Sequence, residues 1–440
     1  MRLRAITVPA FLLLAVACAR PPKADLDAKR TLDALRQAKP ELPSGDLAIA
    51  LTTLAWKDHP DLDEARAQLE AAKAGIRTAK AIPNPSFGFS ATKAEGVPQP
   101  WTLTYGLTFP IELGGKRRLR VKQARLQVEA AQLAMADTAW KLRSGVRVAL
   151  TDWQQAREVS MAAEREASLR ADLLKLQDRR YALGQIGAPE HATAALEARR
   201  AEAARLVAQT DLHRAASAVA LAAGIPLPSL QTRLDAEPAP DLALPATLPP
   251  QETDALLHRL DVRRVLLAWD QNETALDQEL AQRVPNLQIG PGYSFDQGVK
   301  KWSLGLSVDL PIFDRRKGPI AEAVARRGVI EAQLRQVETH ALSDAALAGT
   351  RYASARDRLQ AQMEAMKQQQ ARFDTAKRAF DLGGTDRGDL LAAELEALQS
   401  RLFAVDAWAE AQRARLAMED AFQKPLDGAE QPYPFDEVKR

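Results

Sequence analysis

Two stretches of the chain alternate apolar with small polar residues, and each lies before a very long run of helical periodicity. Residues 101–109 alternate Trp, Leu, Tyr, Leu and Phe with Thr and Gly, and residues 302–310 alternate Trp, Leu and Val with Ser, Gly and Asp. A period of two predicts β-strands. Shorter apolar alternations at 86–92 and 287–295 precede them, so the pattern predicts two β-hairpins.

Alternation of this kind over about ten residues is typical of transmembrane strands. Trp101 and Trp302 open both return strands, where an aromatic girdle at the membrane interface would lie. Soluble hairpins with one face on a core explain the same pattern. Four strands cannot close a barrel, and lipid does not tolerate open strand edges. Either the chain is soluble, therefore, or several copies share one barrel, and three copies would supply twelve strands.

The helical runs that follow the hairpins are exceptionally long. They cover about 116–183 and 319–382, which corresponds to about 100 Å each at 1.5 Å per residue and implies coiled-coil-type packing. Each run ends at a Gly-containing turn, and a returning helix follows at about 190–223 and 389–423. These patterns predict two antiparallel helical hairpins.

The two halves repeat one another at an offset of about 200 residues, which indicates a tandem duplication of one large unit. Each unit is predicted to be helix, β-hairpin, long helix, turn and helix. The predicted divisions are a signal peptide at 1–17, an N-terminal segment at 18–60, a first repeat at 61–227 with strands at about 85–110, a Pro-rich connector at 228–252, a second repeat at 253–426 with strands at about 285–311, and a tail at 427–440.

The N-terminus has the pattern of an export signal. Arg2 and Arg4 precede an apolar run and then Ala17-Cys18. The single Cys of the chain follows this run as in a bacterial lipoprotein box, so Cys18 is a candidate lipidation site. An ordinary signal cleaved after Ala17 is the alternative. No other segment has the apolar run of about 20 residues that a transmembrane helix needs.

Composition and charge argue against catalysis and nucleic-acid binding. The chain is 46% hydrophobic and 27% charged, with a net charge of +3. Its positive and negative charges are too nearly equal in number to indicate a nucleic-acid partner. Its five His residues are scattered, no phosphate-binding loop is present, and no metal ligand set or cofactor is implied. Lys116, Arg117 and Arg118, which follow the first hairpin, are interpreted as interface or ion-pairing groups. The chain is predicted not to be an enzyme.

The repeated motifs resemble the TolC-type outer membrane efflux proteins (outer membrane factors), and most closely their cobalt–zinc–cadmium heavy-metal efflux branch. The motifs that carry the resemblance are Ala79-Lys-Ala-Ile-Pro-Asn-Pro, Phe109-Pro-Ile-Glu-Leu-Gly-Gly-Lys-Arg-Arg, Leu310-Pro-Ile-Phe-Asp, Leu183-Gly and Leu382-Gly.

The resemblance implies a mainly α fold with a membrane β-barrel, in which four strands per chain join a trimeric twelve-stranded barrel above an α-helical periplasmic tunnel. It implies a homotrimer in the outer membrane of a Gram-negative cell, lipid-anchored and barrel-inserted. A periplasmic adaptor (membrane fusion protein) and an inner-membrane transporter of the resistance-nodulation-division type are the implied partners. The protein would be a passive conduit, with heavy-metal cations as the expected substrates.

The resemblance also implies functional residues at the two helical turns. In the family, an acidic residue six places after the turn Gly helps to ring the periplasmic entrance, and counting gives Asp389 and Glu190 here. The family's second acidic position, three residues further on, is occupied by Ala392 in this chain. Both carboxylates also suit the first turn of a helix, whatever their role. The expected adaptor-docking residues at the turns are Arg180, Leu183, Gly184, Gly187, Leu382, Gly383 and Arg387.

Two other functions fit the pattern. One is a duct for drugs, organic compounds or secreted polypeptides, because a passive tunnel selects little. The other is a helical coiled-coil scaffold lipoprotein without a pore. The paired alternating strands favour a duct, since a scaffold has no need of them.

Overall fold

The computed structural model describes residues 26–37, 45–243 and 253–426. The chain divides into two compact units, Met1–Glu41 and Leu42–Arg440. Within its described residues the first unit contains helix α1 (Ala28–Gln37). The predicted signal peptide, the lipidation site Cys18 and the 427–440 tail lie outside the described residues.

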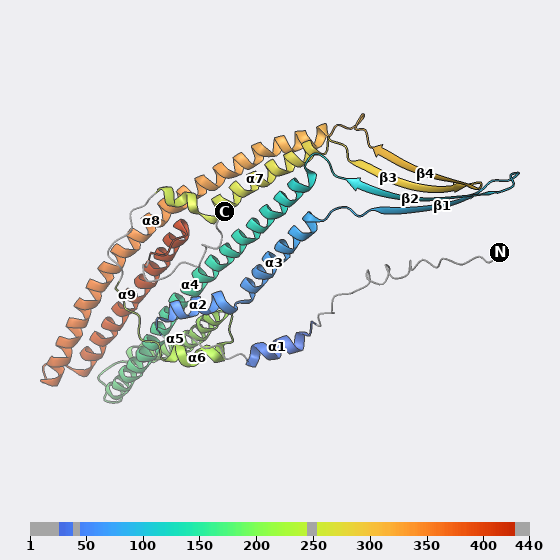
Figure 1. Cartoon of the computed structure of the whole chain (residues 1–440). Helices are drawn as coiled ribbons and strands as arrows, with labels where there is room; N and C mark the ends of the chain where they lie inside the picture. The colour runs from blue at the N-terminus through green and yellow to red at the C-terminus, as the bar shows by residue number, and fades with distance from the viewer. Residues whose placement is uncertain (1–25, 38–44, 244–252, 427–440) are drawn as a thin grey trace. The chain divides into compact units, whose positions relative to one another are not determined.

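The second unit contains the same succession of elements twice (Figure 1). The predicted repeat of helix, β-hairpin, long helix, turn and helix is confirmed. The first repeat consists of α3 (Pro60–Lys80), β1 (Ser86–Lys93), β2 (Trp101–Ile111), α4 (Lys116–Ala182) and α5 (Ala188–Ala222). Helix α2 (Leu47–Asp58) precedes it, and α6 (Leu227–Asp235) follows it. The second consists of η2 (Thr253–His258), α7 (Leu260–Ala281), β3 (Leu287–Asp296), β4 (Val299–Val308), α8 (Lys317–Asp381) and α9 (Arg387–Phe422).

The two hairpins join into one antiparallel sheet of order β1-β2-β3-β4. The β2–β3 pairing connects the repeats, with Tyr105 opposite Tyr293. Neighbouring aromatic rings run across the sheet, and the ring centroids of Tyr293 and Trp302 are 4.9 Å apart. The outer edges of β1 and β4 have no strand partner in the described part of the chain. Large apolar side chains stay exposed on these strands, and Trp302 is 84% exposed.

The helices pack around α4 more completely than around α8. α4 packs against α3 and α5 of its own repeat and against α7 and α9 of the other, whereas α8 packs against α7, α9 and η2 of its own repeat. The two helices have 67 and 65 residues, yet α4 buries more than twice as many side chains as α8. The repeats are therefore alike in structure but not in their surroundings.

The Pro-rich connector contains a helix that its composition did not predict. α6 begins directly after Pro226 and carries Pro228 in its first turn, where a missing N–H has no cost. Its Leu230 and Leu234, one turn apart, are fully buried in a cluster with α2, α4 and α5. Within the described ranges, none of the helices has both the length and the apolar character needed to cross a membrane.

Candidate functional site

The two helical turns that were predicted as functional have the same backbone geometry. α4 ends before Gly184, whose φ is +69°, and the N–H of Gln185 donates to the carbonyl of Arg180 at 2.8 Å. α8 ends before Gly383, whose φ is +76°, and the N–H of Gly384 donates to the carbonyl of Ala379 at 2.8 Å. This is the Schellman ending, which requires a left-handed residue and therefore favours Gly.

Both turns expose apolar side chains. Leu183 is 71% exposed and Leu382 is 88% exposed, each directly before its turn Gly. The returning helices begin close behind, α5 after Gly187 and α9 after Asp386. We refer to residues 180–190 and 379–389 as the two tips.

The predicted entrance carboxylates are exposed residues in the first turns of α5 and α9. The side chain of Glu190 makes no hydrogen bond or ion pair among the described residues. The carboxylate of Asp389 accepts a hydrogen bond from the Thr385 hydroxyl at 3.0 Å, and its backbone N–H donates to Asp386 Oδ1 at 2.8 Å. The two acids therefore differ: one is held by its own turn and the other is unconstrained.

Sequence reasoning missed the acid that connects the tips. Asp386 caps α9, and its Oδ2 accepts a hydrogen bond from the Arg180 guanidinium of the other repeat at 3.0 Å. The N–H of Asp389 lowers the pKa of Asp386 most, and the N–H of Gly388 and the Arg180 charge lower it further. An Asp that follows a Gly-containing turn and lies three residues before another acid, here Asp389, is an N-cap signal that could have identified it.

A second, longer ion pair joins the second tip to α4 of the other repeat. Arg387 of α9 lies 3.8 Å from Asp172 of α4, whose carboxylate also pairs with Lys175 at 2.9 Å. At the first tip, the ring of Tyr181 stacks on that of His191, the residue directly after the tip, with centroids 4.8 Å apart. Of the predicted docking residues, Arg180 and Arg387 are thus engaged between the repeats.

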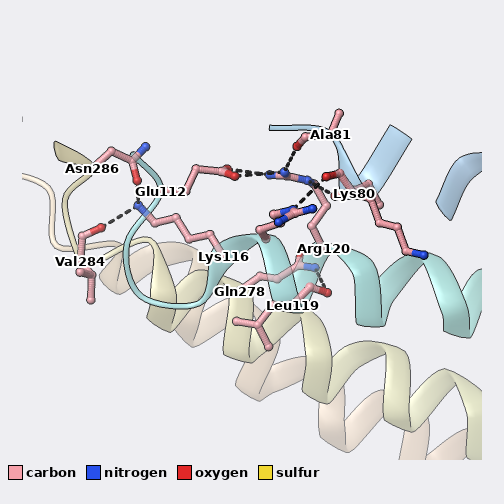
Figure 2. A network of polar contacts seen from close by, with 11 residues as sticks. Lys80, Ala81, Glu112, Lys116, Leu119, Arg120, Gln278, Val284 and Asn286 are labelled. Carbon is pink, nitrogen blue, oxygen red and sulfur yellow. Dashed lines mark hydrogen bonds and ion pairs between the residues drawn. The ribbon is translucent and has the colours of Figure 1, made fainter. Parts of the chain in front are cut away.

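A second polar cluster lies where the strands meet the helices (Figure 2). The Arg120 guanidinium donates to both carboxylate oxygens of Glu112, at 2.7 and 3.1 Å, and to the carbonyls of Ala79 and Ala81. The hydrogen bond from Arg120 lowers the pKa of Glu112. This cluster ties the end of β2 and the end of α3 to the start of α4.

Lys116 connects this junction to the other repeat. Its Nζ donates to the carbonyl of Val284 and to Asn286 Oδ1, both at 2.6 Å, as Figure 2 shows. The residue is only 8% exposed, and burial lowers its pKa. Arg117 donates to the carbonyl of Lys80. Of the two interpretations of these cations, Lys116 fits an interface group, because Lys116 and Arg117 both donate to neutral oxygens and Lys116 reaches the other repeat.

Comparison with known proteins assigns the chain to a family. The model of the outer membrane efflux proteins matches residues 51–225 and 253–422. The chain belongs to this family. The two matched segments correspond to the two repeats, so the duplication is part of the family's fold. The family consists of outer membrane channel proteins, not enzymes, and the chain is an outer membrane efflux channel. A scaffold without a pore is therefore not its function.

Individual relatives agree with this assignment. The cobalt-zinc-cadmium resistance protein CzcC of Cupriavidus metallidurans is 28% identical over 294 residues, 65% of this chain and 68% of the relative. The CmeC outer membrane channel of Campylobacter jejuni superposes with a TM-score of 0.69 at 16% identity, covering 94% of this chain and 95% of that one. The outer membrane protein VceC of Vibrio cholerae superposes with a TM-score of 0.66 at 22% identity, covering 86% of this chain and 96% of that one. At these identities the structures establish the TolC-like fold alone.

This outer membrane efflux protein also has a buried ion pair between its repeats. Arg143 of α4 and Glu419 of α9 are 1% and 0% exposed, with 2.6 Å between Nη2 and Oε2. The Arg143 guanidinium lies over the ring of Trp140, 4.9 Å from its centroid. The N–H of Leu426 donates to the same carboxylate. In the described ranges no cluster of three or more His, Cys, Asp or Glu could hold a metal ion.

Proposed function

We propose that three copies of this chain form one outer membrane duct, with twelve strands closing the pore. The observation that carries this proposal is the four-stranded sheet with two unpaired edges. An unpaired edge exposes a row of N–H and carbonyl groups, each of which costs several kcal/mol in hydrocarbon. A channel built on this sheet therefore needs the edge of β4 to pair with β1 of another copy.

The proposed cargo is heavy-metal cations. The support is the 28% identity to a cobalt-zinc-cadmium resistance protein over two thirds of its length. An inner-membrane transporter of the resistance-nodulation-division type and a periplasmic adaptor would deliver the cargo, since a passive duct selects little itself. Organic compounds and secreted polypeptides are the alternative cargoes.

The tips are the proposed periplasmic entrance. Glu190 and Asp389, repeated in three copies, would form an acidic ring, and such rings attract cations. The pair Arg180–Asp386 would hold the two tips of one chain together, and Arg387–Asp172 would hold the second tip to α4. The proposed adaptor-docking residues are Arg180, Leu183, Gly184, Gly187, Leu382, Gly383 and Arg387; the exposed leucines among them offer apolar surface to a partner.

The N-terminal and domain predictions also stand as proposals. A signal peptide at 1–17 would be removed and Cys18 acylated, giving an outer membrane lipoprotein with repeats at 61–227 and 253–426 joined by the 228–252 connector. Metabolic labelling with radioactive palmitate checks the acylation. We expect label in the wild type and none in Cys18→Ser, and an unlabelled wild type contradicts it.

Deletion of the gene tests the cargo. We expect the deletion strain to lose tolerance to zinc, cobalt or cadmium and to recover it with the wild-type gene. Asp389→Asn with Glu190→Gln should recover it only in part, because the acidic ring is gone. The matched control is Glu396→Gln, an exposed carboxylate two turns further along α9, and it should recover tolerance fully. Unchanged metal tolerance with lost drug tolerance would contradict the metal assignment.

A further inference from the structure

The contact of Lys116 occurs between repeats, and the sequence contains its counterpart. At the offset of about 200 residues, Lys116 corresponds to Lys317, the first residue of α8, as Pro110 does to Pro311. The acceptor segment Val284-Pro285-Asn286 corresponds to Ile82-Pro83-Asn84 before β1. Both halves of the contact are thus present a second time.

The second set does not meet within the chain. Lys317 adjoins β4 and Asn84 adjoins β1, which are the two outer strands of the sheet. The side chains of Lys317 and Asn84 are both exposed, and neither makes a hydrogen bond or ion pair to any residue that the structure describes. Ile82 is 67% exposed. Lys116, in contrast, is buried and holds two acceptors at 2.6 Å.

The pairing of β2 with β3 explains how the first set comes together. Phe109 lies opposite Ile289, and Ile111 opposite Leu287. This register brings the end of β2, and Lys116 behind it, to the segment that leads into β3. If β4 pairs with β1 of a second copy in the same register, Leu310 faces Phe87 of that copy. The chain then brings Lys317 to the second acceptor segment.

We infer that Lys317 donates to the Ile82 carbonyl and the Asn84 side chain of a neighbouring copy, and so ties each subunit to the next at the strand–helix junction. The partner is a second copy of this chain, because Ile82-Pro83-Asn84 matches the segment that already accepts hydrogen bonds from Lys116. Repetition of one head-to-tail contact gives a closed ring when the rotation between copies closes, as it does in the proposed trimer. The inference rests on the proposed trimer and adds the residues that hold its junction.

The surroundings of α8 agree with the same partner. α4 is packed by α7 and α9 across the repeat boundary, and no comparable packing of α8 against α3 or α5 occurs among the described elements. A neighbouring copy would supply that packing from its own α3 and α5. One neighbouring copy would therefore account for both the missing packing of α8 and the unengaged side chain of Lys317.

Cross-linking of introduced cysteines tests the contact in the full-length detergent-solubilised protein. Asn84→Cys with Lys317→Cys should link copies into dimers and trimers on denaturing gels after treatment with a bifunctional thiol reagent of about 8–10 Å, longer than a direct disulfide allows. Each single variant should give less than a tenth of that product, which controls for Cys18. The matched pair Lys116→Cys with Asn286→Cys should link only within one chain.

Lysine acylation of the wild type supplies a second readout that needs no substitution. In the assembled protein Lys317 should react at least ten-fold more slowly than the exposed Lys175, and it should lose this protection when heat separates the copies. A trimer by light scattering with neither the inter-copy link nor the protection would overturn the inference and leave the proposed duct standing. A monomer would overturn both.

Discussion

Removing the buried charge of Glu419 should destabilise the protein far more than removing an exposed charge from the same helix. Glu419 and its partner Arg143 are 0% and 1% exposed. Loss of one member of a buried pair costs about 3–5 kcal/mol, because the other charge stays buried after its oppositely charged partner is removed. We expect Glu419→Gln to lower the free energy of unfolding by about 3 kcal/mol, the lower end of this range, because the amide oxygen still accepts a hydrogen bond.

The matched control is Glu410→Gln, also on α9. Glu410 pairs with Arg358 at the same 2.6 Å, but these side chains are 49% and 58% exposed, and an exposed pair contributes about 0–1 kcal/mol. For a chain longer than 250 residues, about 1 kcal/mol shifts Tm by roughly 2 °C or less, so Glu419→Gln should lower Tm by roughly 3–6 °C.

Circular dichroism of the detergent-solubilised protein on heating at pH 7.5 measures the difference. Combining Glu419→Leu with Arg143→Met should lower Tm by less than the sum of the two single changes, because residues in one ion pair are coupled. Equal Tm values for Glu419→Gln and Glu410→Gln would refute the reasoning that burial sets the energy of this pair.

Three further predictions concern the tips, the junction and the connector. Asp386→Asn should raise single-channel conductance in planar bilayers, because it removes the ion pair with Arg180 that holds the two tips together. The increase should be the same factor at pH 5.5 and pH 8, because the pKa of Asp386 is lowered and the carboxylate loses its charge only below the ordinary carboxyl range of about 4. A factor that differs between the two pH values would contradict this. Gly114→Ala should lower Tm, because the φ of Gly114 is +71° and the added Cβ would lie 3.0 Å from Val284 Cβ. The control Gly145→Ala lies inside α4 with open space around it and should leave Tm unchanged or raise it. Equal effects of the two substitutions on Tm would argue against strain at the junction. Leu230→Ala should lower the free energy of unfolding by about 2–5 kcal/mol, because Leu230 is fully buried. A decrease below about 1 kcal/mol, measured by thermal unfolding, would show that packing against the core does not hold α6 in place.

The repeat and its elements were predictable because their signals are local. The strands follow from strict alternation, and the long helices follow from helical periodicity without an interrupting Pro. The helix α6 was hidden because a Pro-rich composition suggests irregular chain, while Pro at a helix start is harmless. The helix is stabilised by the packing of Leu230 and Leu234 against the core, and local sequence patterns do not reveal that contact.

The tip residues were predictable only in part. Counting from the turn Gly found Asp389, but the partner of Arg180 is Asp386, and that pairing needs the two tips to lie side by side. Arg143 and Glu419 were missed for a similar reason. On helices this polar every charge fits a solvated face, and only the packing of α4 on α9 separates the buried pair from the exposed ones.

The number of copies in the assembly tests the central claim most directly, because four strands per chain must be pooled to close a pore. Native mass spectrometry of the detergent-solubilised protein measures it. We predict a mass of three mature chains that persists after release of detergent. A single chain, or an assembly of two or four copies, would contradict a twelve-stranded duct.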